Sequence, residues 1–81
     1  MATMTLVDST FIYGSSPRES AFRALDHIRD VYGIRHVSLD AKARAIRVEF
    51  DASRLTEDDL TALLRGAGFD VRRWARGAVV A

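Results

Sequence analysis

The chain has 81 residues, which make one small domain with a thin core. Its hydrophobic content of 48% and charged content of 28% are typical of a soluble globular protein and exclude a disordered chain. The absence of cysteine excludes disulfides, thiolate metal sites, iron–sulfur clusters and a cysteine nucleophile, and the net charge of +1 is far from that of a dedicated nucleic-acid binder.

The first half of the chain predicts a strand, a helix and a second strand. Residues 5–13 favour a strand, although two polar residues interrupt it. Apolar residues then recur with a period of 3.6, which predicts a helix over residues 17–32 that ends at Gly33. Residues 34–39 predict the second strand, and residues 40–43 a tight turn after it.

The segment GSSPRES, residues 14–20, is predicted to begin this helix with a capping box. Ser16 is expected to accept a hydrogen bond from the backbone N–H of Glu19, while the Glu19 side chain reaches back to the N–H of Ser16. Pro17 then occupies the first helical position, where its missing N–H costs nothing. As an alternative, Glu19 pairs with Arg23 one turn further on.

The sequence predicts no catalytic arrangement around these serines. A serine nucleophile needs a base within about 3 Å. Seven residues of helix place His27 about 10 Å from Ser20, and His36 lies beyond the far end of the helix. The Gly-x-Ser-x-Gly elbow of serine hydrolases is also missing from the segment. We therefore expect a domain that is not an enzyme.

The second half predicts a strand, a helix and a last strand. Residues 44–51 alternate strictly between apolar and polar side chains, as in a half-buried strand. Thr56 and Asp59 form a predicted capping box for a helix that ends at Gly68, and residues 71–74 begin the last strand before an apolar tail. The order βαββαβ predicts a ferredoxin-like α+β sandwich, with one four-stranded antiparallel sheet and two helices on one face.

Several short motifs follow one another in an unbroken register from Gly14 to Val71: GIRHV (33–37), IRVEFDASRLTEDDL (46–60) and GFDV (68–71). In this register the chain resembles the heavy-metal-associated (HMA) domain family of copper chaperones and N-terminal modules of metal-transporting P-type ATPases. The resemblance implies a single HMA-like domain over residues 1–81, with its core over about 5–76. It also implies a role in heavy-metal transport or homeostasis.

The chain departs from the family at the metal ligands. The two positions that match the family's CxxC thiolates hold Pro17 and Ser20, and the position of the loop methionine holds Ser15. Copper(I) requires soft sulfur ligands, so we expect no cofactor at the former metal-loop region, defined as Gly14, Ser15, Ser16, Pro17, Ser20 and Phe69. The alternative is a divalent transition metal held weakly by non-cysteine ligands, for which the candidates are Glu19, His27 and His36, or by a ligand from a partner.

A second candidate site is the face of the sheet that the helices leave open. The resemblance places Thr10 and Ile12 inward, so Phe11 and Tyr13 are expected on the open face, together with Arg47 and Glu49 of the third strand. These four residues are the predicted partner interface or a surface for self-association. In the alternative register, shifted by one residue, Phe11 and Tyr13 belong to the core.

The predicted function is therefore a non-catalytic protein-interaction or regulatory module. Its expected partner is another protein domain, such as a metal transporter or a ferredoxin-like domain, and its expected location is the cytoplasm or the cytoplasmic side of a transporter, without membrane insertion. The alternative is an RNA-binding domain of the same fold, in which Phe11 and Tyr13 stack on bases and three arginines near the C-terminus contact phosphates. Nucleic acid is not favoured, because the third strand lacks outward aromatic residues.

Overall fold

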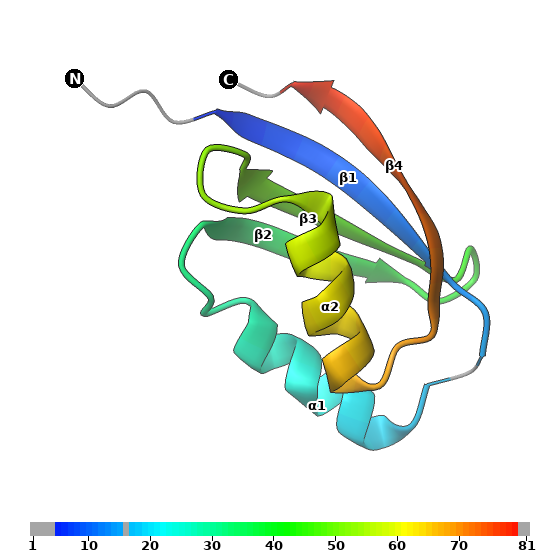
Figure 1. Cartoon of the computed structure of the whole chain (residues 1–81). Coiled ribbons are helices and arrows are strands. Elements are labelled where there is room, and N and C mark those ends of the chain that lie inside the picture. Colours follow the sequence, from blue (N-terminus) through cyan, green and yellow to red (C-terminus); the bar gives the residue numbers. More distant parts are fainter. Residues whose placement is uncertain (1–4, 16, 80–81) are drawn as a thin grey trace.

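The computed structural model describes residues 5–15 and 17–79. They form a ferredoxin-like α+β fold in the predicted order βαββαβ (Figure 1). The elements are β1 (Leu6–Tyr13), α1 (Glu19–Ile28), β2 (Ile34–Asp40), β3 (Ala45–Asp51), α2 (Glu57–Ala67) and β4 (Val71–Val79). The last strand continues well beyond residue 74, and it includes the first two residues of the apolar tail.

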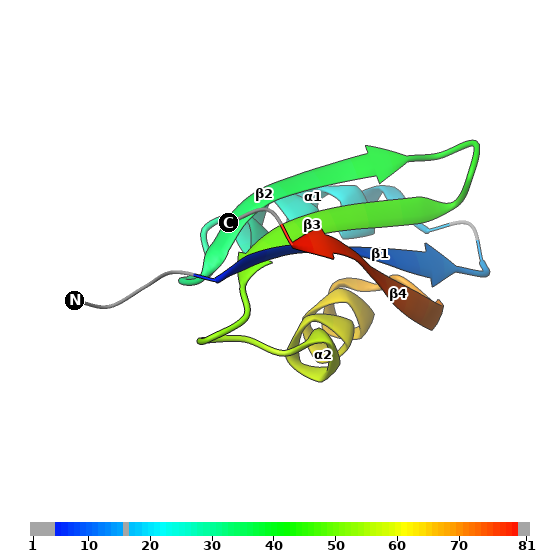
Figure 2. The same cartoon turned by 90° about the horizontal axis from the view of Figure 1, so that it is seen from above.

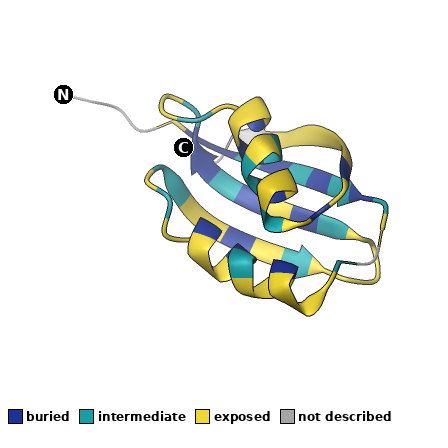
Figure 3. Cartoon of the chain, turned by 60° about the horizontal axis from the view of Figure 1, so that its bottom comes forward, coloured by how far each residue is buried: buried dark blue, intermediate teal, exposed yellow. Residues whose placement is uncertain are grey.

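All neighbouring strands of the sheet run antiparallel, in the order β2-β3-β1-β4. β1 and β3 are therefore central, and β2 and β4 form the two edges (Figure 2). Both helices lie on the same face of the sheet, and each carries buried positions among exposed ones (Figure 3). The other face of the sheet is not covered by any element of the described chain, so the register of each strand decides which side chains it exposes.

The register of β1 differs from the one that the resemblance implies. Phe11 and Tyr13 are only 0% and 3% exposed and belong to the core, whereas Thr10 and Ile12 are half-buried on the opposite face. The prediction that Phe11 and Tyr13 point to the open face is wrong, and the alternative register is confirmed. The physical reason is that β1 lies in the middle of the sheet beneath both helices, where large aromatic side chains bury the most apolar surface.

The β2–β3 hairpin follows the sequence pattern closely. Ile46, Val48 and Phe50 of β3 are completely buried, while the alternate residues face the other side. In the turn, the Asp40 carboxylate accepts hydrogen bonds from the backbone N–H groups of the second and third residues after it, at 3.1 and 3.2 Å. An aspartate side chain thus stabilises a turn that lacks the usual Asn-Gly signature.

Helix α1 is shorter at both ends than predicted. It begins at Glu19 after the N-cap residue Arg18, which makes no side-chain capping bond, so Pro17 precedes the helix. The predicted capping partner Ser16 lies outside the described residues, and Glu19 instead pairs with Arg23 at 3.3 Å. The helix ends at Ile28 because the backbone then closes successive turns up to Gly33, whose φ of +100° is left-handed.

Helix α2 has the predicted caps. The Thr56 hydroxyl accepts from the backbone N–H of Asp59 at 3.2 Å, and the Asp59 carboxylate accepts from the N–H of Thr56 at 2.9 Å. Gly68 ends the helix with φ +112°. This left-handed conformation is strained for residues with a Cβ. Local sequence therefore fixes both ends of α2, in contrast to α1.

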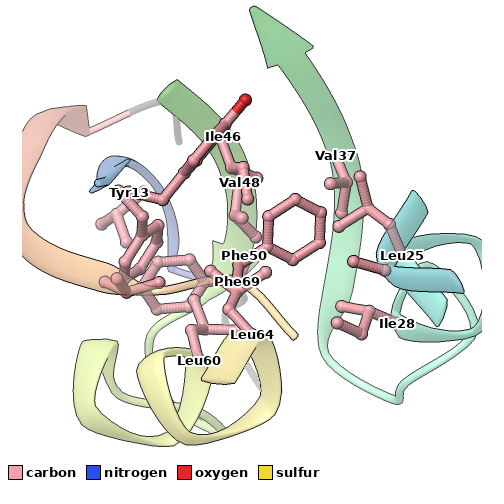
Figure 4. Packing of buried hydrophobic residues seen from close by; sticks show 14 residues of the cluster. Tyr13, Leu25, Ile28, Val37, Ile46, Val48, Phe50, Leu60, Leu64 and Phe69 are labelled. Atoms are coloured by element: carbon pink, nitrogen blue, oxygen red, sulfur yellow. The ribbon is translucent and has the colours of Figure 1, made fainter. Parts of the chain in front are cut away.

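The core fills the space between the helices and the sheet. Figure 4 shows Leu60, Leu64 and Phe69 packing on the α2 side and Leu25 and Ile28 on the α1 side. All five side chains are less than 7% exposed. Because both helices contribute to one continuous cluster, the loss of volume on either side weakens the whole domain.

We expect Leu64→Ala to lower the free energy of unfolding by about 2–5 kcal/mol. Leu64 is only 1% exposed, so the substitution leaves a cavity in the core. That loss is comparable to the whole stability of a small domain. The matched control is Gly66→Ala on the same helix, where an added Cβ meets no atom within 4 Å. It should raise stability by about 0.5–1 kcal/mol. Urea unfolding measures both, and a harmless Leu64→Ala would contradict the core assignment.

Candidate functional site

The former metal-loop region is tied down by polar contacts with neighbouring loops. The Gly14 carbonyl accepts from the Arg44 guanidinium at 2.8 Å, and the Gly14 N–H donates to the backbone oxygen of Asp70 at 2.9 Å. The Ser15 hydroxyl donates to the Asp70 carboxylate at 3.3 Å. The loop therefore holds its shape through hydrogen bonds between hard oxygen and nitrogen atoms.

Two guanidinium groups flank this loop, a feature that the sequence analysis missed. Arg44 bonds to Gly14, and the side chain of Arg72 lies so close to Gly14 that any Cβ there would collide with it. Arg72 also pairs with Asp70 at 3.0 Å. The Asp70 carboxylate offsets the charge of Arg72, so Arg44 is the guanidinium that adds positive charge beside the loop. Arg44 and Arg72 are far from Gly14 in the sequence, so only the folded chain brings them to this loop.

Phe69 is 1% exposed and packs in the core beside the loop. Its ring lies 5.5 Å from the ring of Tyr13 and 6.0 Å from that of Phe22, in edge-to-face geometry in both cases. The family's aromatic position is thus part of an aromatic cluster, which stabilises the end of the sheet next to the loop.

The candidate ligands do not converge. Ser20 and Glu19 are exposed at the start of α1, His27 is exposed near its end, and His36 is exposed on β2. Within residues 5–15 and 17–79 no group of three or more histidine, aspartate or glutamate side chains could hold a metal ion. Pro17, half-buried, contributes no ligand atom from its side chain.

The open face of the sheet carries charged pairs rather than aromatics. Arg47 and Glu49 lie there, as predicted, in register with Thr10 and Asp8 of β1. The Arg47 guanidinium donates two hydrogen bonds to the Asp8 carboxylate, at 3.0 and 2.6 Å. Arg35 lies 3.6 Å from the Glu49 carboxylate. The centre of the face therefore carries one close pair, Arg47 with Asp8, and a looser contact between Arg35 and Glu49 toward β2.

Two shallow grooves lie on this face, one on each side of Thr10. The groove toward β2 has a volume of about 290 Å³ and includes Ser38, Ala45 and Arg47 in its lining. The groove toward β4 has a volume of about 360 Å³ and includes Ile12 and Arg73. Small side chains along the middle of the face thus leave space that the chain itself does not fill.

The RNA-binding alternative loses its principal support. Phe11 and Tyr13 were its stacking residues, and both are buried beneath the helices. Trp74 lies opposite Phe11 in the β1–β4 register, is 42% exposed at the sheet edge, and also lines the groove beside Thr10 and Ile12. Bases stack on exposed aromatic rings on the open face in this fold.

A buried carboxylate is the second feature that sequence analysis missed. Glu57 is 4% exposed at the start of α2, although its position indicated only an interaction with the helix dipole. Arg76 of β4 donates two hydrogen bonds to it, at 2.5 and 2.7 Å, and the Ser9 hydroxyl of β1 donates a third at 3.0 Å. The hydrogen bonds from Arg76 are the main cause that lowers the pKa of Glu57 below its usual value of 4.5.

Asp51 organises the connection between β3 and α2. Its carboxylate accepts from the Ser53 hydroxyl at 2.7 Å and from the Ser53 and Thr5 backbone N–H groups at 3.0 and 3.2 Å. Arg54 lies 3.3 Å away. The hydroxyl hydrogen bond from Ser53 is the largest of the causes that lower the pKa of Asp51. Both buried carboxylates are thus satisfied within the fold and are not poised to bind a ligand.

We expect Glu57→Gln to lower stability at neutral pH by about 2 kcal/mol, the scale of a hydrogen bond to a charged group. A lowered pKa in the folded state means that the ionised carboxylate contributes stability above pH 4.5, and that this contribution is lost as the pH falls through the lowered value. The difference in the free energy of unfolding between the variant and the original chain should therefore become smaller as the pH falls below 4.5. Thermal unfolding across this pH range measures it.

The control for this prediction is Asp58→Asn, an exposed residue in the same first turn of α2. It removes a similar interaction with the helix dipole, worth only about 0.3–1 kcal/mol, but no buried contact. Equal losses in the two variants would show that Glu57 acts through the dipole alone.

We expect copper(I) and zinc titrations of the chain to show only weak association in about the millimolar range, because the loop offers no sulfur and is flanked by Arg44 and Arg72. The matched variant combines Pro17→Cys with Ser20→Cys, which restores the family's ligand spacing. It should gain tight copper(I) binding, measured by competition with a chelator. Tight one-to-one binding by the original chain would contradict the prediction, and a double variant without affinity would weaken the resemblance.

No helix of the described residues is long and apolar enough to cross a membrane. Comparison of the chain with family models, with curated proteins and with solved structures finds no match in any of the three. Membership of the HMA family therefore stays a prediction from the motifs and their register, whereas the ferredoxin-like fold is observed directly.

Proposed function

We propose that the chain is a non-catalytic protein-interaction module that docks another protein domain on the open face of its sheet. The observation that carries this proposal is that one face of the sheet is covered by both helices, while the other presents two unfilled grooves beside Thr10. The resemblance to the HMA family suggests the process in which this contact takes part, namely the regulation of heavy-metal transport or homeostasis.

The chemistry of the face favours a folded protein as the partner. Asp8, Arg47 and Glu49 present both signs of charge within a small area. A phosphate backbone would require a surface of one positive sign, whereas protein interfaces commonly match mixed charges around an apolar centre. Thr10 and Ile12 occupy that centre, where a partner's side chains can enter the grooves on either side.

The paired charges also limit the affinity that this face can provide. Arg47 already donates two bonds to Asp8, so a partner gains little from either group unless it keeps the pair intact. Affinity must then come from the apolar centre and from shape complementarity, while the charges fix orientation. The proposal therefore describes a docking contact of modest strength, as expected for a regulatory module.

Site-specific photocrosslinking in the natural host tests this function. A benzophenone amino acid at Thr10 should give a discrete adduct with one partner protein, because this position lies between the two grooves. The matched control is the same amino acid at Ala62, an exposed position on α2 in the opposite layer. With the purified partner, Thr10→Arg should weaken binding by at least about tenfold, since a long charged side chain blocks both grooves.

The outcomes separate the alternatives. An adduct at Thr10 that contains only a second copy of the chain would replace the proposal with self-association through the sheet face. An adduct of equal yield at Ala62, or no adduct at Thr10, would refute docking on the open face.

A further inference from the structure

Two adjoining cavities lie where the end of α1 meets the edge strand β2. The smaller has a volume of about 170 Å³ and is lined by Arg29, Arg35, His36 and Val37. Every polar side chain in this lining is basic. Arg29 and Arg35 also line the larger cavity of about 460 Å³, so the two spaces lie side by side.

The two guanidinium groups hold only loose partners. Arg29 lies 3.4 Å from Asp26, and Arg35 lies 3.6 Å from Glu49, distances beyond the 2.7–2.9 Å that is typical of a charge-assisted hydrogen bond. Each guanidinium has five N–H donors, and these side chains are 49% and 62% exposed. Each ion pair brings one guanidinium nitrogen near a carboxylate, so both groups keep further N–H donors for an anion, although the carboxylates of Asp26 and Glu49 lie close by and oppose it.

The backbone adds to this arrangement. β2 is the last strand of the sheet, so no strand of the described chain pairs with its outer side. The β2–β3 register shifts between Ile34 and His36, which places an irregularity at Arg35. Sheet edges can form concavities that bind anions, and a bulge at an edge changes the direction of a side chain. The negative end of α1 opposes an anion, but turn hydrogen bonds to His27 and Ile28 already engage the last carbonyls.

The larger cavity supplies a different surface next to these charges. Its lining includes the apolar side chains of Leu6, Val31 and Ile34 and the ring of Tyr32, which is 74% exposed, together with the acidic residues Asp30 and Asp51. The Arg54 guanidinium lies 4.4 Å from the centre of the Tyr32 ring and fixes one wall. An anion bound between Arg29 and Arg35 would therefore carry any attached group over an apolar and aromatic surface.

We infer that this pair of cavities binds a phosphomonoester, with its phosphoryl group between Arg29, Arg35 and His36 and a compact apolar or aromatic group in the larger cavity. A phosphomonoester is close to a dianion at neutral pH, and the planar guanidinium fork matches its oxygens. The cavities are distinct from the grooves beside Thr10, although Arg35 also contacts Glu49 of the open face, so the inference goes beyond the proposed function and is tested without a protein partner.

NMR titrations of the isotope-labelled chain test the site at neutral pH and constant ionic strength. The probes are phenyl phosphate, inorganic phosphate and sodium chloride. Phenyl phosphate should shift the backbone signals of residues 29–37 in a saturable manner and bind more tightly than inorganic phosphate, because its ring enters the larger cavity. Sodium chloride should produce no localised shifts.

Arg35→Gln should weaken phenyl phosphate binding by about tenfold, the effect of losing one charged hydrogen-bonding group. Arg23→Gln is the control, since it removes an exposed arginine from the middle of α1 that does not line either cavity, and it should leave the affinity unchanged. Equal affinity for the two phosphates would overturn the ester assignment. Shifts spread over all arginines, or equal losses in the two variants, would overturn the site, and spectra of the unliganded variants verify that both are folded.

Discussion

The direction in which the side chains of β1 point is the constraint on which the rest of the structure depends. β1 pairs with both β3 and β4, so its alternation sets the inner and outer faces of three strands at once. With Phe11 and Tyr13 inward, the core gains two aromatic rings beneath the helices, and Thr10 and Ile12 are left on the open face. A slip of one residue would exchange these sets, because side chains alternate with a period of two. The chemistry of the open face is therefore a consequence of how the core is filled.

The buried carboxylate of Glu57 joins the helix layer to the sheet. Its partners Ser9 and Arg76 come from β1 and β4, so three elements meet at one group. An ionised carboxylate removed from water is costly unless its oxygens are fully hydrogen-bonded, as they are here. Because of this cost, the Glu57 contacts add little net stability. Their main effect is to fix the position of the start of α2 over the edge strand β4. Arg76 is also the β4 residue that pairs with Ser9 of β1, next to the register shift between Val7 and Ser9.

The end of the domain that resembles a metal-binding loop carries no sulfur ligand in its sequence, and arginines lie beside it. Gly14 lies between the guanidinium groups of Arg44 and Arg72, and Phe69 fills the space beneath it with Tyr13 and Phe22. The surfaces that remain available lie elsewhere, on the open face of the sheet and at the edge of β2. The first combines small side chains with paired charges, and the second combines arginines with an apolar cavity. Their chemistry differs, so they suit different ligands, a protein domain in one case and a small anion in the other.

The sequence by itself determined the order of elements, the hairpin, the alternation of β3 and both ends of α2. These features depend on local chemistry: turn-forming aspartate, strict apolar alternation, and the caps at Thr56 and Gly68. Tertiary structure decided the rest. The register of β1 was ambiguous because polar and apolar residues mix along it, and only burial beneath two helices settled it. The partners of Glu57 and the arginines that gather at Gly14 are far from them in the chain, so no local pattern could have joined them. Arg29 and Arg35 are only six residues apart, and the turns between α1 and β2 bring them to one cavity.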